Sequence, residues 1–204
     1  EETEHKAIAV EALIRKHLGQ NAYWDIYHAV LSADKEKADA VLGTMLAARK
    51  LPDSTRIMEY LSHPKVEKVF ELSRNVGGEA HSLKGFLRFQ ELANGVLYAG
   101  ITPKSQVLTC LAPHFADRLP LENWMIHDKT HHMFVVHESG KKWILLWDEQ
   151  CKIEENLTFS EREKEFEKLW KGFCKTISIP SRENPKCQRL HLPLRFRPDM
   201  VEFR

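Results

Sequence analysis

The sequence predicts an α+β fold in which N-terminal helices pack with an antiparallel sheet. Three observations support it: helical spacing of apolar residues up to residue 75, strand-like runs from Gly85 onward, and an Asn-Gly turn between the first two runs. Hydrophobic residues make up 43% of the chain, which is enough for a core and argues against wholesale disorder. We expect a single domain over residues 1–204, with a helical part (1–75) and a part that carries the sheet, the last helix and the tail (76–204).

The helical part is divided by turn residues. Gly19 is expected to end the first helix, and Pro64 suits the first turn of the last one, which Gly77-Gly78 should end or bend. Between them, Pro52-Asp53 breaks the chain. The apolar positions at helical spacing are Ala7, Val10, Ile14, Leu18, Tyr23, Ile26, Tyr27, Val30, Ala38, Val41, Leu42, Met45, Leu46, Val66, Val69 and Phe70.

The strand-like part begins with a hairpin. Two β-prone runs, Phe86–Leu92 and Val96–Ile101, flank Ala93-Asn94-Gly95, and Asn-Gly is a strong hairpin signal. A short helix from about Ser105 to Leu111 follows. Three further runs then predict an antiparallel meander, and the five strands together predict one antiparallel sheet. These runs are Trp124–His127, Met133–His137 and Trp143–Trp147.

The last helix is expected to start at Ser160, because Ser160-x-x-Glu163 is a capping-box pattern. Four prolines follow from Pro180 onward, so the tail from Ser181 is expected to be an extended basic arm. Five apolar residues at helical spacing predict a buried stripe on the helix. They are Phe166, Leu169, Trp170, Phe173 and Ile177.

Charge is segregated along the C-terminal half. Between Asp148 and Glu167 there are eight acids and three bases, whereas between Leu169 and Arg197 there is one acid against seven bases. Phosphate contacts dominate nucleic-acid affinity, so the basic stretch suggests a polyanion-binding surface, with Phe173 and Phe196 as candidates for base stacking. The alternative is that the acidic and basic stretches form an intramolecular salt-bridge network.

The run Leu111–Asp128 is expected to be a proline-punctuated loop that leads into a strand and concentrates polar groups. His114, Asp117, His127 and Asp128 are candidate acid–base groups there, because histidine beside a carboxylate can act as a general base. Equally, Asp117 and Arg118 could form a structural ion pair, with Trp124 in the core.

Several function classes lose their main support. The sequence has no P-loop, no G-x-G-x-x-G, no G-x-S-x-G and no three-cysteine cluster, so it predicts no cofactor and no metal site. Its four cysteines are scattered, no apolar run is long enough for a membrane span, and we expect a cytoplasmic protein.

Four stretches resemble a known bacterial family: Val76–Phe89, Leu111–Asp128, Leu169–Phe173 and Asn184–Phe196. The family is a domain of unknown function described as DNA metabolism or DNA repair proteins. In it, the domain occurs alone or fused ahead of a uracil-DNA glycosylase-like domain, and it is encoded beside a DNA-repair radical SAM protein. The resemblance therefore implies these two partners. It covers about residues 35–200, and the chain is expected to lack a further N-terminal segment that family members carry.

Together these observations predict an accessory protein of DNA metabolism that binds nucleic acid or a repair partner. The alternatives are an enzyme acting on a nucleotide or damaged base through the four acid–base groups, and a pure protein-interaction module. The expected phosphate contacts are Lys84, Arg88, Arg118, Arg182, Lys186, Arg189, Arg195 and Arg197. A neighbouring pocket is expected to involve His81, Trp124, Asn184 and Gln188, besides His114 and His127.

Overall fold

The computed structural model describes residues 4–147 and 157–204, whose contacts form two compact units. Unit 1 contains the chain up to Ala80 with Lys104–Val107, and unit 2 contains His81–Pro103 with Leu108–Arg204. The predicted boundary at residue 75 lies close to this division, and the single domain stays a prediction. The α+β class is confirmed. No helix in the described ranges is both long enough and apolar enough to span a membrane.

Unit 1 is helical, as predicted. In helix α1, Gly19 has φ 81° and ψ 173°, which interrupts the helix at the predicted place. The hydroxyl of Ser54 donates to the carbonyl oxygen of His17 at 2.6 Å, and this bond satisfies an acceptor freed by the break. The elements of unit 1 are α1 (Glu4–Leu31), α2 (Lys37–Ala48), the 3₁₀ helix η1 (Ser54–Glu59) and the first part of α3 (Pro64–Phe86).

Helix α3 begins at Pro64 as predicted and continues through Gly77-Gly78 to Phe86. The expectation that the two glycines end the helix was wrong, and a bend at them stays a prediction. Each interior glycine costs about 1 kcal/mol relative to alanine. The helix nevertheless continues to bury apolar side chains beyond the glycines, at Ala80 and Leu83. Packing therefore outweighs local propensity here.

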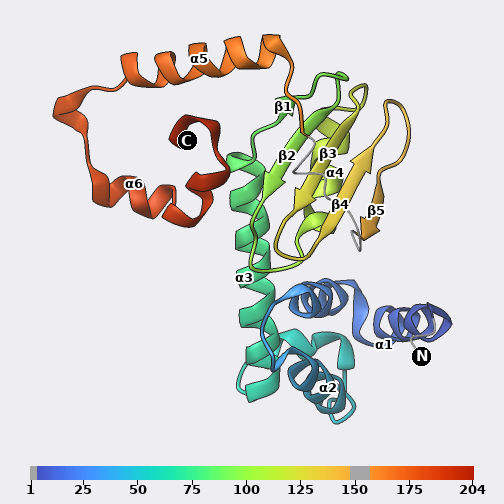
Figure 1. The fold of residues 1–204 in the computed structure, drawn as a ribbon. Coiled ribbons are helices and arrows are strands. Elements are labelled where there is room, and N and C mark those ends of the chain that lie inside the picture. Colours follow the sequence, from blue (N-terminus) through green and yellow to red (C-terminus); the bar gives the residue numbers. More distant parts are fainter. Residues whose placement is uncertain (1–3, 148–156) are drawn as a thin grey trace. The chain divides into compact units, whose positions relative to one another are not determined.

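Unit 2 is built on a five-stranded sheet in the order β1-β2-β3-β4-β5 (Figure 1). The hairpin β1/β2 and the meander β3/β4/β5 are antiparallel as predicted, and Gly95 has φ 81° in the hairpin turn. However, β2 and β3 are parallel, so the sheet is mixed rather than wholly antiparallel. The strands are β1 (Gln90–Glu91), β2 (Leu97–Ile101), β3 (Trp124–Asp128), β4 (Met133–His137) and β5 (Ile144–Trp147).

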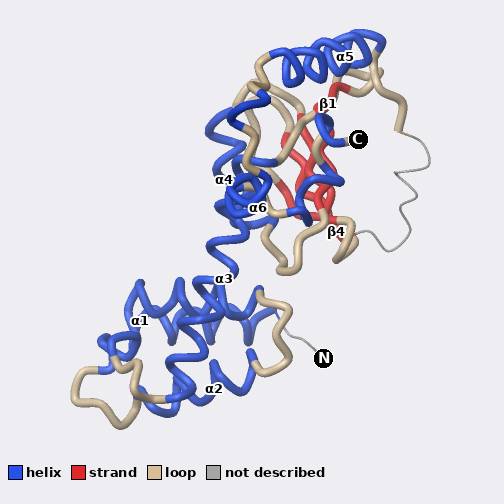
Figure 2. Tube along the Cα trace, turned by 90° about the vertical axis from the view of Figure 1, so that its left-hand side faces the viewer, coloured by secondary structure: helices blue, strands red, loops and turns tan. Residues whose placement is uncertain are grey.

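The parallel pair follows from the connection between β2 and β3. Helix α4 (Leu108–Arg118) continues past Leu111, where the sequence predicted the helix to end and a loop to begin, and parallel neighbours need a crossover of this kind. It packs on one face of the sheet (Figure 2). On that face Phe115 contacts Trp124 edge-on with ring centroids 6.4 Å apart. Trp124 and Ile126 are fully buried on that face.

Helix α5 (Glu161–Thr176) starts as predicted, because the Ser160 hydroxyl accepts from the backbone N–H of Glu163 at 3.0 Å. The predicted burial of its apolar stripe is wrong, and α5 contains no buried residue. The helix is attached to the sheet at its first turn, where a Glu163 carboxylate oxygen accepts from the backbone N–H of Glu91 at 3.0 Å. The exposed fractions are 53% for Phe166, 67% for Leu169, 41% for Trp170, 52% for Phe173 and 58% for Ile177.

The tail from Ser181 is not the extended arm that its prolines suggested. Asn184 caps a helix by accepting from the backbone N–H of Cys187 at 3.0 Å, and Pro185 occupies the first helical turn, where proline is tolerated. Prolines thus start helical turns here instead of preventing them. The tail consists of η3 (Pro180–Arg182), α6 (Pro185–His191), η4 (Leu194–Asp199) and η5 (Val201–Phe203).

Candidate nucleic-acid interface

A pocket lies between the end of α5 and helix α6. Its volume is about 430 Å³, and it brings together three predicted site residues, Arg182, Asn184 and Gln188. Ile177 and Ile179 supply an apolar wall. The remaining lining residues are Ser178, Glu183, Cys187 and His191. We call these nine residues the C-terminal pocket.

The geometry of the pocket follows from the start of α6. The Asn184 side-chain oxygen is held by its cap bond, and Gln188 lies one turn later on the same helix face. Arg182 ends the 3₁₀ turn just before the cap. An amide and a guanidinium group are the groups that read base edges through paired hydrogen bonds, and an isoleucine wall suits the face of a flat ring.

Most of the predicted phosphate-binding cations have no carboxylate partner within residues 4–147 and 157–204. The alternative was a salt-bridge network between the acidic and basic stretches. In the described ranges the two stretches are joined by the ion pair Glu167–Lys171 at 2.7 Å, and residues 148–156 of the acidic stretch lie outside these ranges. Four of the cations, Arg182, Lys186, Arg189 and Arg118, are exposed. The cations without an ion pair to a described carboxylate are Lys84, Arg118, Arg182, Lys186, Arg189 and Arg197.

Arg88 is different, because it is bound to a carboxylate. Its Nη2 lies 2.9 Å from a carboxylate oxygen of Glu202, and its Nη1 donates to the carbonyl oxygen of Gly85 at 2.9 Å. The Glu202 side chain is only 10% exposed, so the pair is largely shielded from solvent. Arg88 therefore anchors η5 to the end of α3, and this geometry does not offer it to a phosphate.

Two arginines of η4 stack on aromatic rings. The Arg195 guanidinium carbon lies 4.4 Å from the Phe196 ring centroid, and that of Arg197 lies 4.8 Å from Phe203. Phe196 itself is buried against Phe86, so it cannot stack on a base as predicted. Phe173 remains exposed on α5.

Two further predicted cations lie at helix ends. Lys84 is in the last turn of α3 and Arg118 in the last turn of α4, where a positive charge complements the helix dipole. His81 is exposed on α3. None of the three lines the C-terminal pocket.

The four predicted acid–base residues are not brought together. His127 and Asp128 are consecutive in β3, so their side chains point to opposite faces of the sheet. His114 lies on α4 with its ring against Phe115, and Asp117 is exposed on the same helix. His127 and Asp128 therefore face different sides of the sheet, and a catalytic role for the four residues stays a prediction.

Two of these residues instead belong to separate buried pairs. The His127 Nδ1 lies 3.1 Å from the Tyr98 hydroxyl, and its ring stacks on Phe134 at 4.2 Å. Asp128 is fully buried, and its carboxylate lies 2.6 Å from the His131 Nδ1. Burial raises the pKa of Asp128, while the bonds from His131 and the backbone oppose that rise.

Trp124 belongs to the core and does not line a pocket with Asn184. It is fully buried, and its ring stacks on His137 at a centroid distance of 4.9 Å. This outcome matches the alternative interpretation of the residue.

Comparison with known proteins identifies the family of this chain. Residues 35–202 match a Domain of unknown function (DUF4130). The chain belongs to this family. No curated protein and no solved structure matches the chain. The matched range contains the C-terminal pocket and the whole sheet, so both are parts of the DUF4130 domain, whereas α1 precedes the match.

Sequence reasoning missed part of the pocket of this DUF4130 chain. His191 and Cys187 line it, four residues apart on α6, as do the two isoleucines that precede the cap. The signal was present: Asn184-Pro185 is a typical helix start, and a helix begun there places Cys187 and His191 on one face. Interpreting the prolines as an extended arm concealed it.

Proposed function

We propose that this protein binds nucleic acid through its C-terminal segment, residues 177–197, as an accessory protein of DNA metabolism or repair. One observation carries the proposal. The C-terminal pocket joins Arg182 to the two predicted amide residues, in a segment whose exposed cations Lys186 and Arg189 have no carboxylate partner in the described part of the chain.

The chemistry of the segment fits a phosphate backbone with one accessible base. Arginine forks match phosphate oxygens, and each neutralised phosphate releases counterions. A volume of about 430 Å³ lies in the range of small-molecule sites and accommodates one nucleobase. The free functional group of Gln188 would then contact the base edge, with Ile177 and Ile179 against its face.

The partners in this proposal follow from the family resemblance. A uracil-DNA glycosylase-like domain or a radical SAM DNA-repair protein would carry out the chemistry, while this chain supplies contact with the polyanion. That division of labour agrees with the dispersal of His114, Asp117, His127 and Asp128 in the structure.

The test is fluorescence anisotropy with single- and double-stranded DNA at two salt concentrations. We expect binding that weakens steeply as salt rises, and a triple variant (Arg182→Gln, Lys186→Gln, Arg189→Gln) with weaker binding and a shallower salt dependence. Each lost phosphate contact reduces the slope of log K against log salt by about 0.7–0.9.

A matched control removes three cations that already have acidic partners. Arg56, Lys141 and Lys164 each form an exposed i,i+3 ion pair, with Glu59, Glu138 and Glu161. The triple variant Arg56→Gln, Lys141→Gln, Lys164→Gln changes net charge equally and should retain binding. Binding that is absent, indifferent to salt, or equally reduced in both triple variants contradicts the proposal.

A further inference from the structure

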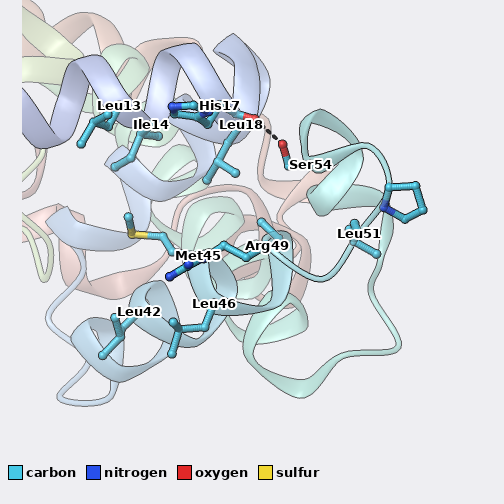
Figure 3. A pocket seen from close by; sticks show the side chains of 12 residues that line it. Leu13, Ile14, His17, Leu18, Leu42, Met45, Leu46, Arg49, Leu51 and Ser54 are labelled. Atoms are coloured by element: carbon cyan, nitrogen blue, oxygen red, sulfur yellow. Dashed lines mark hydrogen bonds between the residues drawn. The ribbon is translucent and has the colours of Figure 1, made fainter.

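An apolar groove lies in unit 1 between α1 and α2, with a volume of about 670 Å³ (Figure 3). Figure 3 shows Leu13, Ile14, His17 and Leu18 coming from α1, Leu42, Met45 and Leu46 from α2, and Arg49 from the position just after α2. The remaining lining residues are Ala48, Leu51, Pro52 and Ser54. The lining is thus mainly aliphatic, with His17 just before the break in α1 and Arg49 just after α2 as polar groups.

The walls of the groove are unusually exposed for aliphatic side chains. Leu13 is 54% exposed, Leu42 56% and Leu46 51%. Arg49 is also exposed, and it forms no ion pair with any carboxylate that the structure describes. Two helices that present leucines on both sides of a trough form the kind of surface that receives an amphipathic helix. The exposed guanidinium of Arg49 favours a helix that carries carboxylates beside its apolar stripe.

Helix α5 of the same chain has these properties. Its exposed stripe includes Leu169, Phe173 and Phe166. Phe166 also lines a pocket with Val201 of η5, so the open part of the stripe is centred on Leu169 and Phe173. At 3.6 residues per turn, three glutamates lie beside the stripe and four lysines lie on the opposite side of the helix. One cation, Arg162, lies on the stripe side, with its guanidinium carbon 5.4 Å from the Phe166 ring centroid. The glutamates are Glu163, Glu165 and Glu167, and the lysines are Lys164, Lys168, Lys171 and Lys175.

The carboxylates beside the stripe are unequally available. Glu163 is bound to the backbone of β1, and Glu167 lies 2.7 Å from the Lys171 ammonium nitrogen. Glu165 is exposed and forms no ion pair among the residues the structure describes. It is therefore the carboxylate available to a cation on another surface.

We propose that two copies of this chain associate by placing α5 of each copy in the α1/α2 groove of the other. The stripe matches the groove in polarity, and Glu165 of one copy faces Arg49 of the other. Reciprocal exchange gives two identical interfaces and closes the assembly as a dimer, which a one-way contact would not do. Ile177 belongs to both the stripe and the C-terminal pocket, but Leu46 and Leu169 lie outside that pocket, so substitutions at these two positions test the association separately from nucleic-acid binding.

The first test separates this pairing from other modes of association. Leu46→Asp places a charge in the groove, and Leu169→Asp places one on the stripe. Sedimentation velocity should show a dimer for the wild type and a monomer for each variant, with association weakened about a hundredfold by the buried carboxylate. An equimolar mixture of the two variants should form a pair again, because one intact groove then meets one intact α5.

Three outcomes would contradict the proposed dimer. The first is a wild type that stays monomeric, including one in which α5 binds the groove of its own chain. The second is dimerisation of either single variant, which would mean that α5 pairs with α5 or groove with groove. The third is a mixture of the two variants that fails to associate. Leu190→Asp, at a site 80% exposed and outside both surfaces, serves as the control and should dimerise.

A charge exchange tests the predicted contact without touching an apolar residue. Arg49→Glu and Glu165→Arg each place like charges at both interfaces and should weaken the dimer. Their mixture restores opposite charges at both interfaces, as does the double variant, and each should dimerise like the wild type. Loss of association that persists in the double variant contradicts the pairing. Circular dichroism on every variant confirms that it is folded, and since both positions are exposed we expect no change.

Discussion

Strand β3 and helix α5 lie in the same unit, and both carry regularly spaced apolar residues, but they differ in what those residues contact. In β3, Trp124 and Ile126 are fully buried between α4 and the sheet. In α5, Leu169 keeps 67% of its surface exposed. The comparison teaches that periodicity predicts the type of an element, whereas burial depends on whether another element covers it.

The two elements are consequently stabilised by different interactions. Strand β3 is paired on both sides and buries apolar surface, at roughly 25 cal/mol per Å². Helix α5 buries no residue and depends more on local interactions: its Ser160 cap, acidic residues in its first turn and Lys175 in its last. It also contacts β1 through Glu163 and packs against η5. Two ion pairs within the helix, Glu161–Lys164 and Glu167–Lys171, make a small contribution to its stability.

The largest expected effect contrasts truncation in the two elements. Ile126→Ala should lower the free energy of unfolding by about 2–5 kcal/mol, because it removes a fully buried side chain and leaves a cavity. Leu169→Ala should change it by less than about 0.5 kcal/mol in the monomer. Urea denaturation at low protein concentration measures both. A loss above about 1 kcal/mol for Leu169→Ala would show that the stripe is covered in the folded monomer.

An intermediate effect is expected at the start of α5. Ser160→Ala removes the cap bond and should destabilise the helix by about 1 kcal/mol. The loss should be local, since α5 has no buried residue, and it should appear as faster amide exchange in Glu161–Thr176 with β3 unchanged.

The control for the cap is at the other end of the same helix. The Thr176 hydroxyl donates to the carbonyl oxygen of Phe173 at 2.9 Å, and Thr176→Ala removes a hydroxyl without removing a cap. We expect little change in exchange near residue 160. If Ser160→Ala accelerates exchange in β3 equally, then α5 and the sheet unfold together and the contrast between them is wrong.

The same distinction explains how far the sequence could predict the fold. Local signals succeeded: Gly19 breaks α1, Asn94-Gly95 makes the hairpin turn, and Ser160 caps α5. The parallel pairing of β2 and β3 is non-local, because it depends on α4 being long enough to cross over the sheet. The burial of the α5 stripe failed for a related reason, since no pattern within a helix reveals whether a partner is present.

The candidate site shows a similar division. Arg182, Asn184 and Gln188 are close in sequence, and they share a pocket as predicted. Arg88 was expected at a phosphate, and only the structure identifies Glu202, distant in sequence, as its partner. His127 and Asp128 were grouped because they are neighbours in the chain, yet the alternation of a strand separates their side chains.

The smallest expected effect concerns the ionisation of Asp128 in the buried sheet, because burial and hydrogen bonding act on it in opposite directions. Burial dominates and raises its pKa above 3.8, so the folded state binds this proton more tightly than the unfolded state. The stability that this proton contributes is complete below pH 3.8 and is lost as pH rises through the raised pKa. The unfolding free energy of the wild type, minus that of Asp128→Asn, should therefore fall over this window and then level off.

Asp53 provides a control of opposite sign, because the Thr55 hydroxyl and backbone N–H lower its pKa. The unfolding free energy of the wild type, minus that of Asp53→Asn, should therefore rise as pH increases toward 3.8. If the Asp128 difference also rises with pH, the bonds from His131 and the backbone outweigh burial, and β3 is then stabilised by its charge as well as by its apolar contacts.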